Sequence, residues 1–132
     1  MEPRSKHFKK REAILNCLRS TTTHPTAEWV HAQLKAEYPD ISLGTVYRNL
    51  ALFKKQGIIQ SVGTVNGTER FDGNPHPHVH FICTQCDAVL DLPELTPPQE
   101  LCSAAAQGVG GQVSACNLSF TGICGECTNT NI

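Results

Sequence analysis

The amino-acid sequence predicts an α+β protein in which a winged helix-turn-helix domain is followed by a small α/β domain. The first observation behind this class is the order of elements in residues 1–73, where three amphipathic helices precede a β-hairpin, as in a winged helix. The second is a pair of Cys-x-x-Cys motifs in residues 78–132, which can join the two ends of that segment. Residues 74–77, Asn-Pro-His-Pro, form the expected hinge between the domains.

Three helices are expected in the first domain. The first covers residues 5–19 and has an isoleucine and two leucines on one face. It is followed by a break, since Pro25 disfavours helical backbone at the histidine before it. Thr26 is a suitable N-cap for the second helix. Ser42 is suitable for the third, which is expected to end at Gly57.

The third helix has one apolar face and one polar face. Val46, Leu50 and Phe53 recur at i, i+4 and i+7, which predicts a single buried stripe. The opposite face, at about 100° per residue, carries further residues of this helix. They are Gly44, Arg48, Ala51 and Lys55, with Thr45 and Tyr47 beside them.

The remaining elements are mostly strands. Asn-Gly at residues 66–67 is a strong hairpin signal, so strands are expected at 58–62 and 68–72. The second domain is expected to contain five further features in order. These are a strand at 78–83 leading into a turn at 83–86, a strand at 88–92, a helix at 93–107, a turn at 108–111 and a strand at 112–123.

The net charge of −1 hides an asymmetry between the two halves of the chain. Residues 1–60 hold ten Lys or Arg and five Asp or Glu, a balance of +5. Residues 61–132 hold one and seven, a balance of −6. A basic half suits a polyanion and an acidic half suits cations, although two ordinary solvated surfaces have the same composition.

The sequence favours a cytoplasmic location with no membrane partner. No apolar run approaches the roughly 18 residues of a membrane span. The first residues contain no apolar signal segment. Because thiols stay reduced in the cytoplasm, paired cysteines there indicate metal binding more than disulfides.

Four cysteines form the stronger of two candidate metal sites. Cys83 and Cys86 make one Cys-x-x-Cys pair, and Cys124 and Cys127 make another about forty residues later. Four thiolates close a tetrahedral zinc shell without an open position. The alternative is two unrelated buried pairs. A structural zinc would pin the C-terminal tail to the turn after the first strand of the domain.

A second candidate site contains histidines. His78 and His80 are two apart on an expected strand and share one face, while the first cysteine of the following turn falls on the other. Two histidines do not complete a metal shell. The further candidates are Asp72, Asp91 and His24, although each of them, taken singly, is more typical of a surface or capping position. A mixed His/Asp shell favours Fe(II) or Mn(II) over zinc.

Taken together, the motifs resemble the Fur family of metal-dependent bacterial transcription regulators. The matching segments cover almost the whole chain in order. They are His-Pro-Thr-Ala at 24–27, the helix at 42–50, Glu-Arg-Phe-Asp at 69–72, the His- and Cys-containing segment at 78–86, and Cys-Gly-Glu-Cys at 124–127.

The resemblance implies a DNA-binding winged helix and a dimerisation domain, hence a homodimeric, metal-dependent repressor of a double-stranded DNA operator, and not an enzyme. It implies structural Zn²⁺ at the four cysteines and a regulatory Fe²⁺ or Mn²⁺ at a separate site. The implied regulatory ligands are His24, Asp72, His78, His80 and Asp91. Regulatory metal would fix the angle between the domains and so order the dimer for DNA.

Aspartates at 72 and 91 resemble the peroxide-sensing members of the family, since iron-sensing members usually carry glutamates there. In the peroxide sensors, Fe(II) reacts with peroxide and ligand histidines are oxidised, which releases the DNA. The residues implied to be oxidation-sensitive are His24 and His78.

The third helix of a winged helix enters the DNA major groove. Arg48 is expected to reach guanine or phosphate, and Tyr47 to reach a thymine methyl group or phosphate. Lysines and arginines nearby are expected to contact phosphates. The full set of expected DNA-binding residues is Thr45, Tyr47, Arg48, Lys55, Lys10 and Arg11.

Three other functions remain open at this point. One is a ferrous-iron-responsive repressor of iron uptake genes. Another is a small metallohydrolase, which would need an open metal position and a general base in a substrate cleft. A zinc-ribbon interaction module would explain the cysteines but not the histidines. Metal-dependent DNA binding would separate the last two from a regulator.

Overall fold

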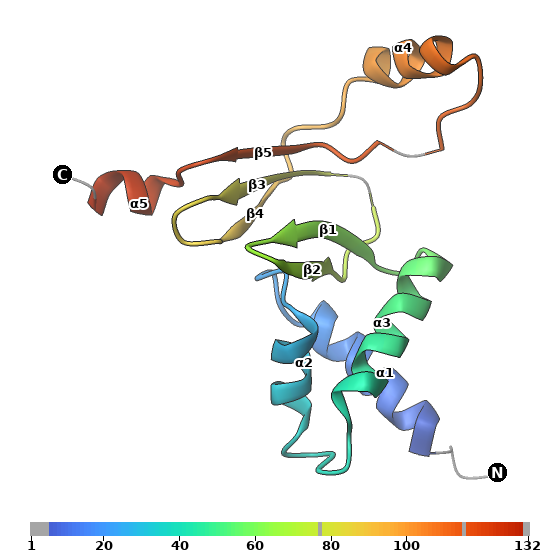
Figure 1. Cartoon of the computed structure of the whole chain (residues 1–132), viewed down its shortest axis with the longest axis vertical. Coiled ribbons are helices and arrows are strands. Elements are labelled where there is room, and N and C mark those ends of the chain that lie inside the picture. Colours follow the sequence, from blue (N-terminus) through green and yellow to red (C-terminus); the bar gives the residue numbers. More distant parts are fainter. Residues whose placement is uncertain (1–5, 77, 115, 131–132) are drawn as a thin grey trace. The chain divides into compact units, whose positions relative to one another are not determined.

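The computed structural model describes residues 6–76, 78–114 and 116–130, and its chain divides into two compact units between Pro75 and His76 (Figure 1). This division falls inside the expected hinge. Ser5 and Pro77, which the sequence pattern assigns to the first helix and the hinge, lie outside the described residues. None of the helices in the described residues is long and apolar enough to span a membrane.

The first unit is a winged helix, as predicted. Its elements are α1 (Lys6–Arg19), α2 (Ala27–Leu34), α3 (Leu43–Gln56), β1 (Gln60–Val65) and β2 (Thr68–Asp72). The two strands form an antiparallel hairpin. Its turn has φ of 51° at Asn66 and 84° at Gly67, the two positive values that a type I′ hairpin turn requires.

Side-chain caps begin two of the helices. The Thr26 hydroxyl accepts a hydrogen bond from the backbone N–H of Trp29 at 3.1 Å. Ser42 accepts one from the N–H of Thr45 at 3.0 Å. Both bonds satisfy N–H groups that have no partner within the helix, which confirms the predicted starts of α2 and α3.

Replacing Thr26 with alanine is expected to lower the free energy of unfolding of the first unit by about 1 kcal/mol, because the N-cap bond to α2 is lost. Urea denaturation followed by the fluorescence of Trp29 measures this change. Thr22→Ala is the matched control, since Thr22 is exposed and precedes the helix. Equal stabilities of the two variants would contradict the capping role.

The end of α3 explains why the first strand of the hairpin, β1, starts later than predicted. Gly57 has φ of 75°, a left-handed conformation that favours glycine. The N–H of Ile58 then bonds to the carbonyl oxygen of Phe53 at 3.1 Å, which closes the last turn of the helix. Because Ile58 is used in this cap, β1 begins at Gln60 and not at residue 58.

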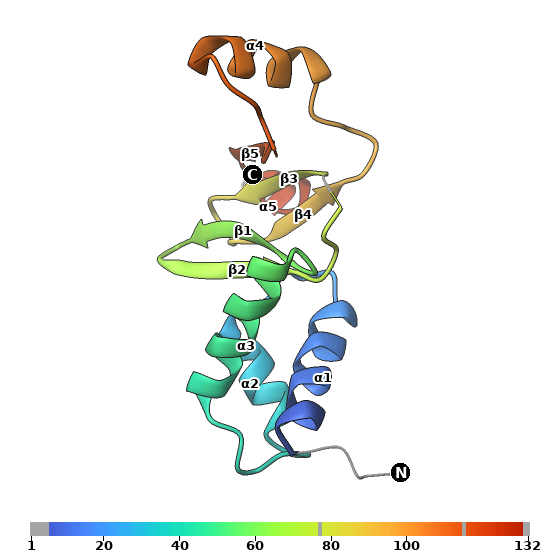
Figure 2. The same ribbon diagram turned by 90° about the vertical axis from the view of Figure 1, so that its right-hand side faces the viewer.

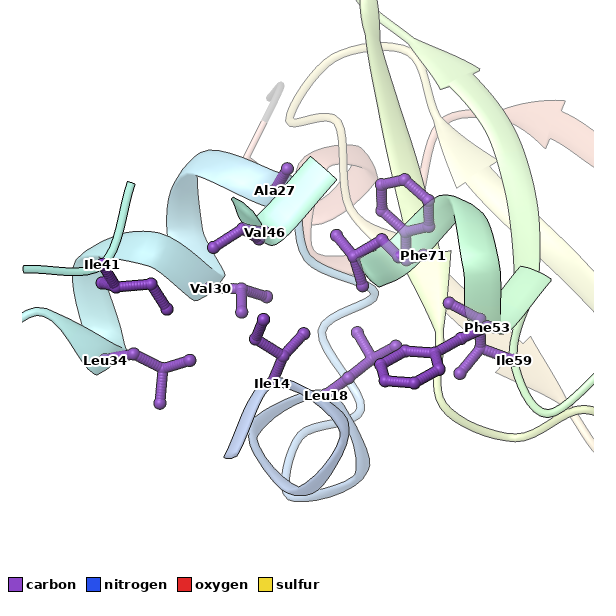
Figure 3. Packing of buried hydrophobic residues seen from close by; sticks show 11 residues of the cluster. Ile14, Leu18, Ala27, Val30, Leu34, Ile41, Val46, Phe53, Ile59 and Phe71 are labelled. Carbon is purple, nitrogen blue, oxygen red and sulfur yellow. The ribbon is translucent and has the colours of Figure 1, made fainter. Parts of the chain in front are cut away.

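The helices and the hairpin enclose one hydrophobic core (Figure 3). The predicted stripe of α3, Val46, Leu50 and Phe53, is no more than 2% exposed. The other buried members are Ile14, Leu18, Ala27, Val30, Leu34, Ile41, Ile59 and Phe71. Burial of this stripe turns the opposite, polar face of α3 to solvent.

The second unit contains a three-stranded sheet, with β3 (Val79–Cys83) in its centre. β4 (Val89–Leu92) is antiparallel to β3 on one side, and β5 (Ser119–Gly122) is parallel to β3 on the other. The helices are α4 (Gln99–Val109) and α5 (Gly125–Thr130). In both views α4 stands away from the sheet (Figures 1 and 2).

Two predicted elements of this unit differ from the structure by more than two residues, and one helix has no predicted counterpart. The helix predicted at 93–107 begins only at Gln99, because prolines occupy the preceding positions and Pro98 is its N-cap residue. Within the described residues of 112–123, only Ser119–Gly122 form a strand, and Ala115 lies outside the described residues. The short helix α5 was not predicted, since its six residues contain no apolar periodicity.

The hydrophobic core of the second unit is small. Its buried apolar residues, among those that the structure describes, are Val79, Cys83, Val89 and Cys124. The helix α4 contributes no buried residue. A unit with so little buried apolar surface needs another source of stability, such as a bound metal or a partner chain.

Candidate metal centres and nucleic-acid interface

The four predicted cysteines meet in the second unit. The Sγ atoms of Cys83 and Cys127 are 3.8 Å apart, as are those of Cys86 and Cys124. Every pair of the four sulfurs lies within 4.8 Å. A zinc ion with Zn–S bonds of about 2.3 Å separates its sulfur ligands by about 3.8 Å in a regular tetrahedron. The donor set therefore fits structural zinc.

Backbone groups prepare one of these thiols for metal. The N–H groups of Cys124 and Cys86 each lie 3.4 Å from Sγ of Cys83. They lower the pKa of Cys83 to about 6, because N–H donors favour the thiolate. Burial, together with the neighbouring thiols, raises the pKa of Cys127 to about 12. Four thiolates in one place thus require a cation to neutralise their charge.

The parallel pairing of β5 with β3 brings Cys124 and Cys127 close to Cys83 and Cys86. The N–H of Thr84 donates to the carbonyl oxygen of Gly122 at 2.8 Å, directly before the second pair of cysteines. Gly122 allows this close approach, since a Cβ at this position would lie 3.1 Å from the ring of Phe81, which would have to shift. The helix α5 then carries Cys127 back toward Cys83.

Three predicted metal ligands also converge in the second unit. His80 on β3 lies opposite Asp91 on β4 in the antiparallel register. The Nε2 atoms of His78 and His80 are 2.9 Å and 3.3 Å from the same oxygen of Asp91. The two imidazole rings are neighbours, with centroids 4.2 Å apart and planes tilted by 54°. His80 is buried, whereas the Asp91 side chain is 32% exposed.

The tautomer of His78 suits a metal ligand. Its Nδ1 lies 2.7 Å from the carbonyl oxygen of His76, which can only accept, so Nδ1 carries a proton. The Nε2 lone pair is then directed at the carboxylate unless a proton or a metal ion lies between them. One divalent cation would satisfy the ring nitrogens of His78 and His80 and the carboxylate together. His76 contributes its backbone, and its side chain is exposed.

Two further predicted ligands meet in the first unit. His24 Nε2 lies 3.3 Å from Oδ2 of Asp72, and the residues are 2% and 7% exposed. This burial corrects the surface position that each residue suggested singly. The capping role holds in part, since Oδ1 of Asp72 accepts the N–H of Asn74 at 2.9 Å. That bond leaves Oδ2 directed at the histidine.

The exposed face of α3 carries most of the expected DNA-binding residues. Arg48 donates from Nη2 to the hydroxyl oxygen of Thr45 at 3.1 Å, and Arg11 of α1 donates to Oδ1 of Asn49 at 3.1 Å. These four residues and Leu52 line a hollow of about 360 Å³. Two guanidinium groups beside a polar hollow suit a phosphate oxygen.

The other expected DNA contacts are in different surroundings. Lys55 is exposed at the end of α3. The ammonium group of Lys10 is 3.1 Å from a carboxylate oxygen of Asp40, and its side chain is only 15% exposed. A phosphate would have to displace this pairing. The Tyr47 hydroxyl donates to Glu28 at 2.7 Å, which lowers the pKa of Glu28 and directs the phenol along α2.

These features together define a class of protein, namely a metal-dependent DNA-binding regulator. A winged helix presents a basic face, a cysteine cluster stabilises a second unit, and His/Asp donors occur in both units. The model of the ferric uptake regulator family matches residues 4–119. The chain therefore belongs to this family, and it is a metal-responsive transcriptional repressor. Such proteins are transcription regulators and not enzymes, which removes the metallohydrolase interpretation.

The chain is similar to individual members of the family. It is 37% identical over 120 residues to the peroxide-responsive repressor PerR of Staphylococcus aureus, covering 89% of this chain and 79% of that protein. A crystal structure of a Campylobacter jejuni peroxide stress regulator matches with a TM-score of 0.76 and 28% identity, covering 92% and 91% of the two chains. The ferric uptake regulator of Helicobacter pylori, 20% identical, shares the fold with a TM-score of 0.75, covering 98% and 85%.

Proposed function

We propose that this chain is a peroxide-responsive repressor, in which one regulatory metal is held by His24, Asp72, His78, His80 and Asp91. The observation that carries the proposal is the donor set of three imidazoles and two aspartates. It is separate from the cysteine cluster and contains no thiolate. Similarity to peroxide-responsive relatives supports the same function.

Neither unit alone offers a complete shell for such a metal. The first contributes the pair His24 and Asp72, and the second contributes His78, His80 and Asp91. Five nitrogen and oxygen donors suit Fe(II) or Mn(II). A metal that binds all five favours one arrangement of the two units, and a ligand shifts a conformational equilibrium by its differential affinity for the states. Metal binding would in this way select the DNA-binding arrangement.

The sensing step depends on the histidines. Fe(II) held by these residues would activate peroxide, and the ring of His24 or His78 would lose the two electrons that peroxide gains. One peroxide oxygen would enter a ring C–H bond, and the other would leave as water. An imidazole that has gained oxygen is a weaker ligand. The arrangement favoured by the metal is then lost, and so is the affinity for DNA. Mn(II) does not reduce peroxide in this way, so the Mn form stays bound.

One titration tests the peroxide response. The protein is loaded with Fe(II) or Mn(II), treated with increasing peroxide, and followed by mobility shift on a duplex selected by the metal-loaded protein and by peptide mass. We expect loss of DNA binding in the Fe form alone, with a gain of one oxygen mass at His24 or His78. Full DNA binding by the Fe form after peroxide would instead support a ferrous-iron-responsive repressor.

A homodimer on a double-stranded operator completes the proposed function. Exposed apolar side chains are concentrated in the second unit, where the core is small. They are Leu90, Leu95, Leu101, Val109, Val113, Phe120 and Ile123, each at least 36% exposed. Seven exposed apolar side chains on a unit with so small a core support an interaction site there. A second copy would bury it and would place two α3 helices on two half-sites of the operator.

Replacing Arg48 with alanine is expected to weaken operator binding by about 1–3 kcal/mol if the guanidinium contacts a base. The measurement is a mobility-shift titration of the Mn-loaded protein on the selected duplex and on an unrelated duplex. Lys35→Ala is the control, because it removes one exposed positive charge outside α3. An operator affinity equal to that of the control would exclude the base contact.

A further inference from the structure

We propose that Arg70 positions the metal ligand His24, by holding its backbone in a conformation that places the imidazole beside Asp72. This inference rests on the proposed function, since it concerns the regulatory metal site. Arg70 would contact no metal. Its guanidinium would act through the loop that carries His24.

The contacts of Arg70 with this loop are specific. Its Nε donates to the carbonyl oxygen of His24, and its Nη2 donates to the carbonyl oxygen of Thr23 at 2.7 Å. One planar guanidinium thus binds two successive peptide carbonyls. The fork geometry of arginine is rigid, so the pair of bonds sets the orientation of both peptide groups. The ammonium group of a lysine has no such fork.

The backbone that these bonds hold is unusual for a histidine. His24 has φ of 55°, in the left-handed region, and it precedes a proline. This conformation is unfavourable for a residue with a Cβ, so contacts outside the loop have to maintain it. The next residue of β2 adds one such contact, as the N–H of Phe71 donates to the carbonyl oxygen of Pro25 at 2.9 Å.

The strand β2 therefore connects the two ligands of the first unit. Side chains at i and i+2 share a face of a strand, so Arg70 and Asp72 point to one side while Phe71 enters the core. Asp72 presents its oxygen to the His24 imidazole, and Arg70 holds the His24 backbone. A close approach fixes the strand end as well, because a Cβ on Gly73 would lie 3.1 Å from atoms of Arg19. The end of β2 therefore both supplies the ligand Asp72 and holds the loop that carries His24.

Loss of the fork has a defined consequence. Without it the His24 backbone is free to relax toward a common conformation, which moves the imidazole away from Asp72. Metal affinity then falls, although every ligand remains in the chain. Substitution of groups that orient metal ligands typically reduces affinity about 10–100-fold.

The experiment is a double-mutant cycle on Mn(II) affinity, measured by calorimetry on the full zinc-loaded protein. Arg70→Met removes the donors and keeps the apolar stem, and Arg70→Lys keeps the charge without the fork. Both Arg70 substitutions are introduced into the natural chain and into the His24→Ala variant. Lys54→Met is the control, because it removes a neighbouring ion pair of β2, 3.0 Å from Glu69, without touching the His24 loop.

We expect Arg70→Met to weaken Mn(II) binding about 10–100-fold in the natural chain and to have no further effect in His24→Ala. The Mn(II) affinity of Arg70→Lys should lie between those of the natural chain and Arg70→Met. The Mn(II) affinity of Lys54→Met should equal that of the natural chain. Equal losses in both backgrounds would show a general structural role and overturn the inference. The inference would also be overturned if both Arg70 variants bound Mn(II) as tightly as the natural chain does. Should Arg70→Met fail to fold, Arg70→Lys decides by the same criterion.

The outcome separates this inference from the proposed function. If the natural chain binds no metal beyond its zinc, or if His24→Ala binds Mn(II) as tightly as the natural chain, the proposed site itself fails and the inference fails with it. If His24→Ala loses affinity while both Arg70 variants keep it, only the positioning role of Arg70 is wrong.

Discussion

Replacing Cys83 with serine is expected to remove the structural zinc and to unfold the second unit. Cys83 is fully buried, its sulfur lies 3.8 Å from that of Cys127, and it accepts two backbone N–H groups. Binding of a structural zinc contributes directly to folding. Because the apolar core of this unit is small, burial of apolar side chains offers little to compensate for loss of the metal.

Zinc content and hydrogen exchange measure this result. Bound zinc should fall from about one per chain to near zero, and the amides of β3 and β5 should lose protection. The helices of the first unit should keep theirs, since their core contains no residue of the second unit. Cys102→Ser is the control, because Cys102 lies outside the four-sulfur cluster. Retention of zinc by Cys83→Ser would exclude this site.

Replacing Asp91 with alanine is expected to abolish the response to regulatory metal while zinc is retained. Its carboxylate oxygen lies 2.9 Å from Nε2 of His78 and 3.3 Å from Nε2 of His80. Removing it deletes an anionic donor and leaves the two imidazoles without their shared partner. We expect Mn(II) affinity to fall by about 100-fold or more, which exceeds the typical effect of removing a group that only orients a ligand.

Calorimetry and a mobility-shift titration with increasing Mn(II) check this prediction together. Metal should no longer raise the affinity of the variant for the operator, while its zinc content stays at that of the natural chain. Glu94→Ala is the control, since Glu94 is an exposed carboxylate just after β4. A metal response equal to that of the control would exclude Asp91 as a ligand.

The elements predicted most accurately are those determined by local interactions. The starts of α2 and α3 follow from hydroxyl caps three residues before the N–H groups they bind. The hairpin turn follows from the tolerance of Asn66 and Gly67 for positive φ. The buried stripe of α3 follows from helical periodicity. None of these depends on residues far away in the sequence.

The differences arise where distant segments meet. The strand β1 begins at Gln60 and not at the predicted residue 58, because the N–H of Ile58 donates to the carbonyl oxygen of Phe53 in the cap of α3. The parallel strand β5 is only four residues long, since its register with β3 and not its own pattern defines it. Parallel pairing leaves little local signal in a short strand.

The sequence by itself determined the donor chemistry of this protein, namely two Cys-x-x-Cys pairs and a separate group of histidines and aspartates, because residue type and spacing set which metals can bind. Only the tertiary structure decided how these donors are arranged within each unit. The β3–β4 register places Asp91 against His80, and Arg70 holds His24 in a left-handed backbone beside Asp72. Such arrangements depend on hydrogen bonds between segments that are distant in the chain, and no local pattern encodes them.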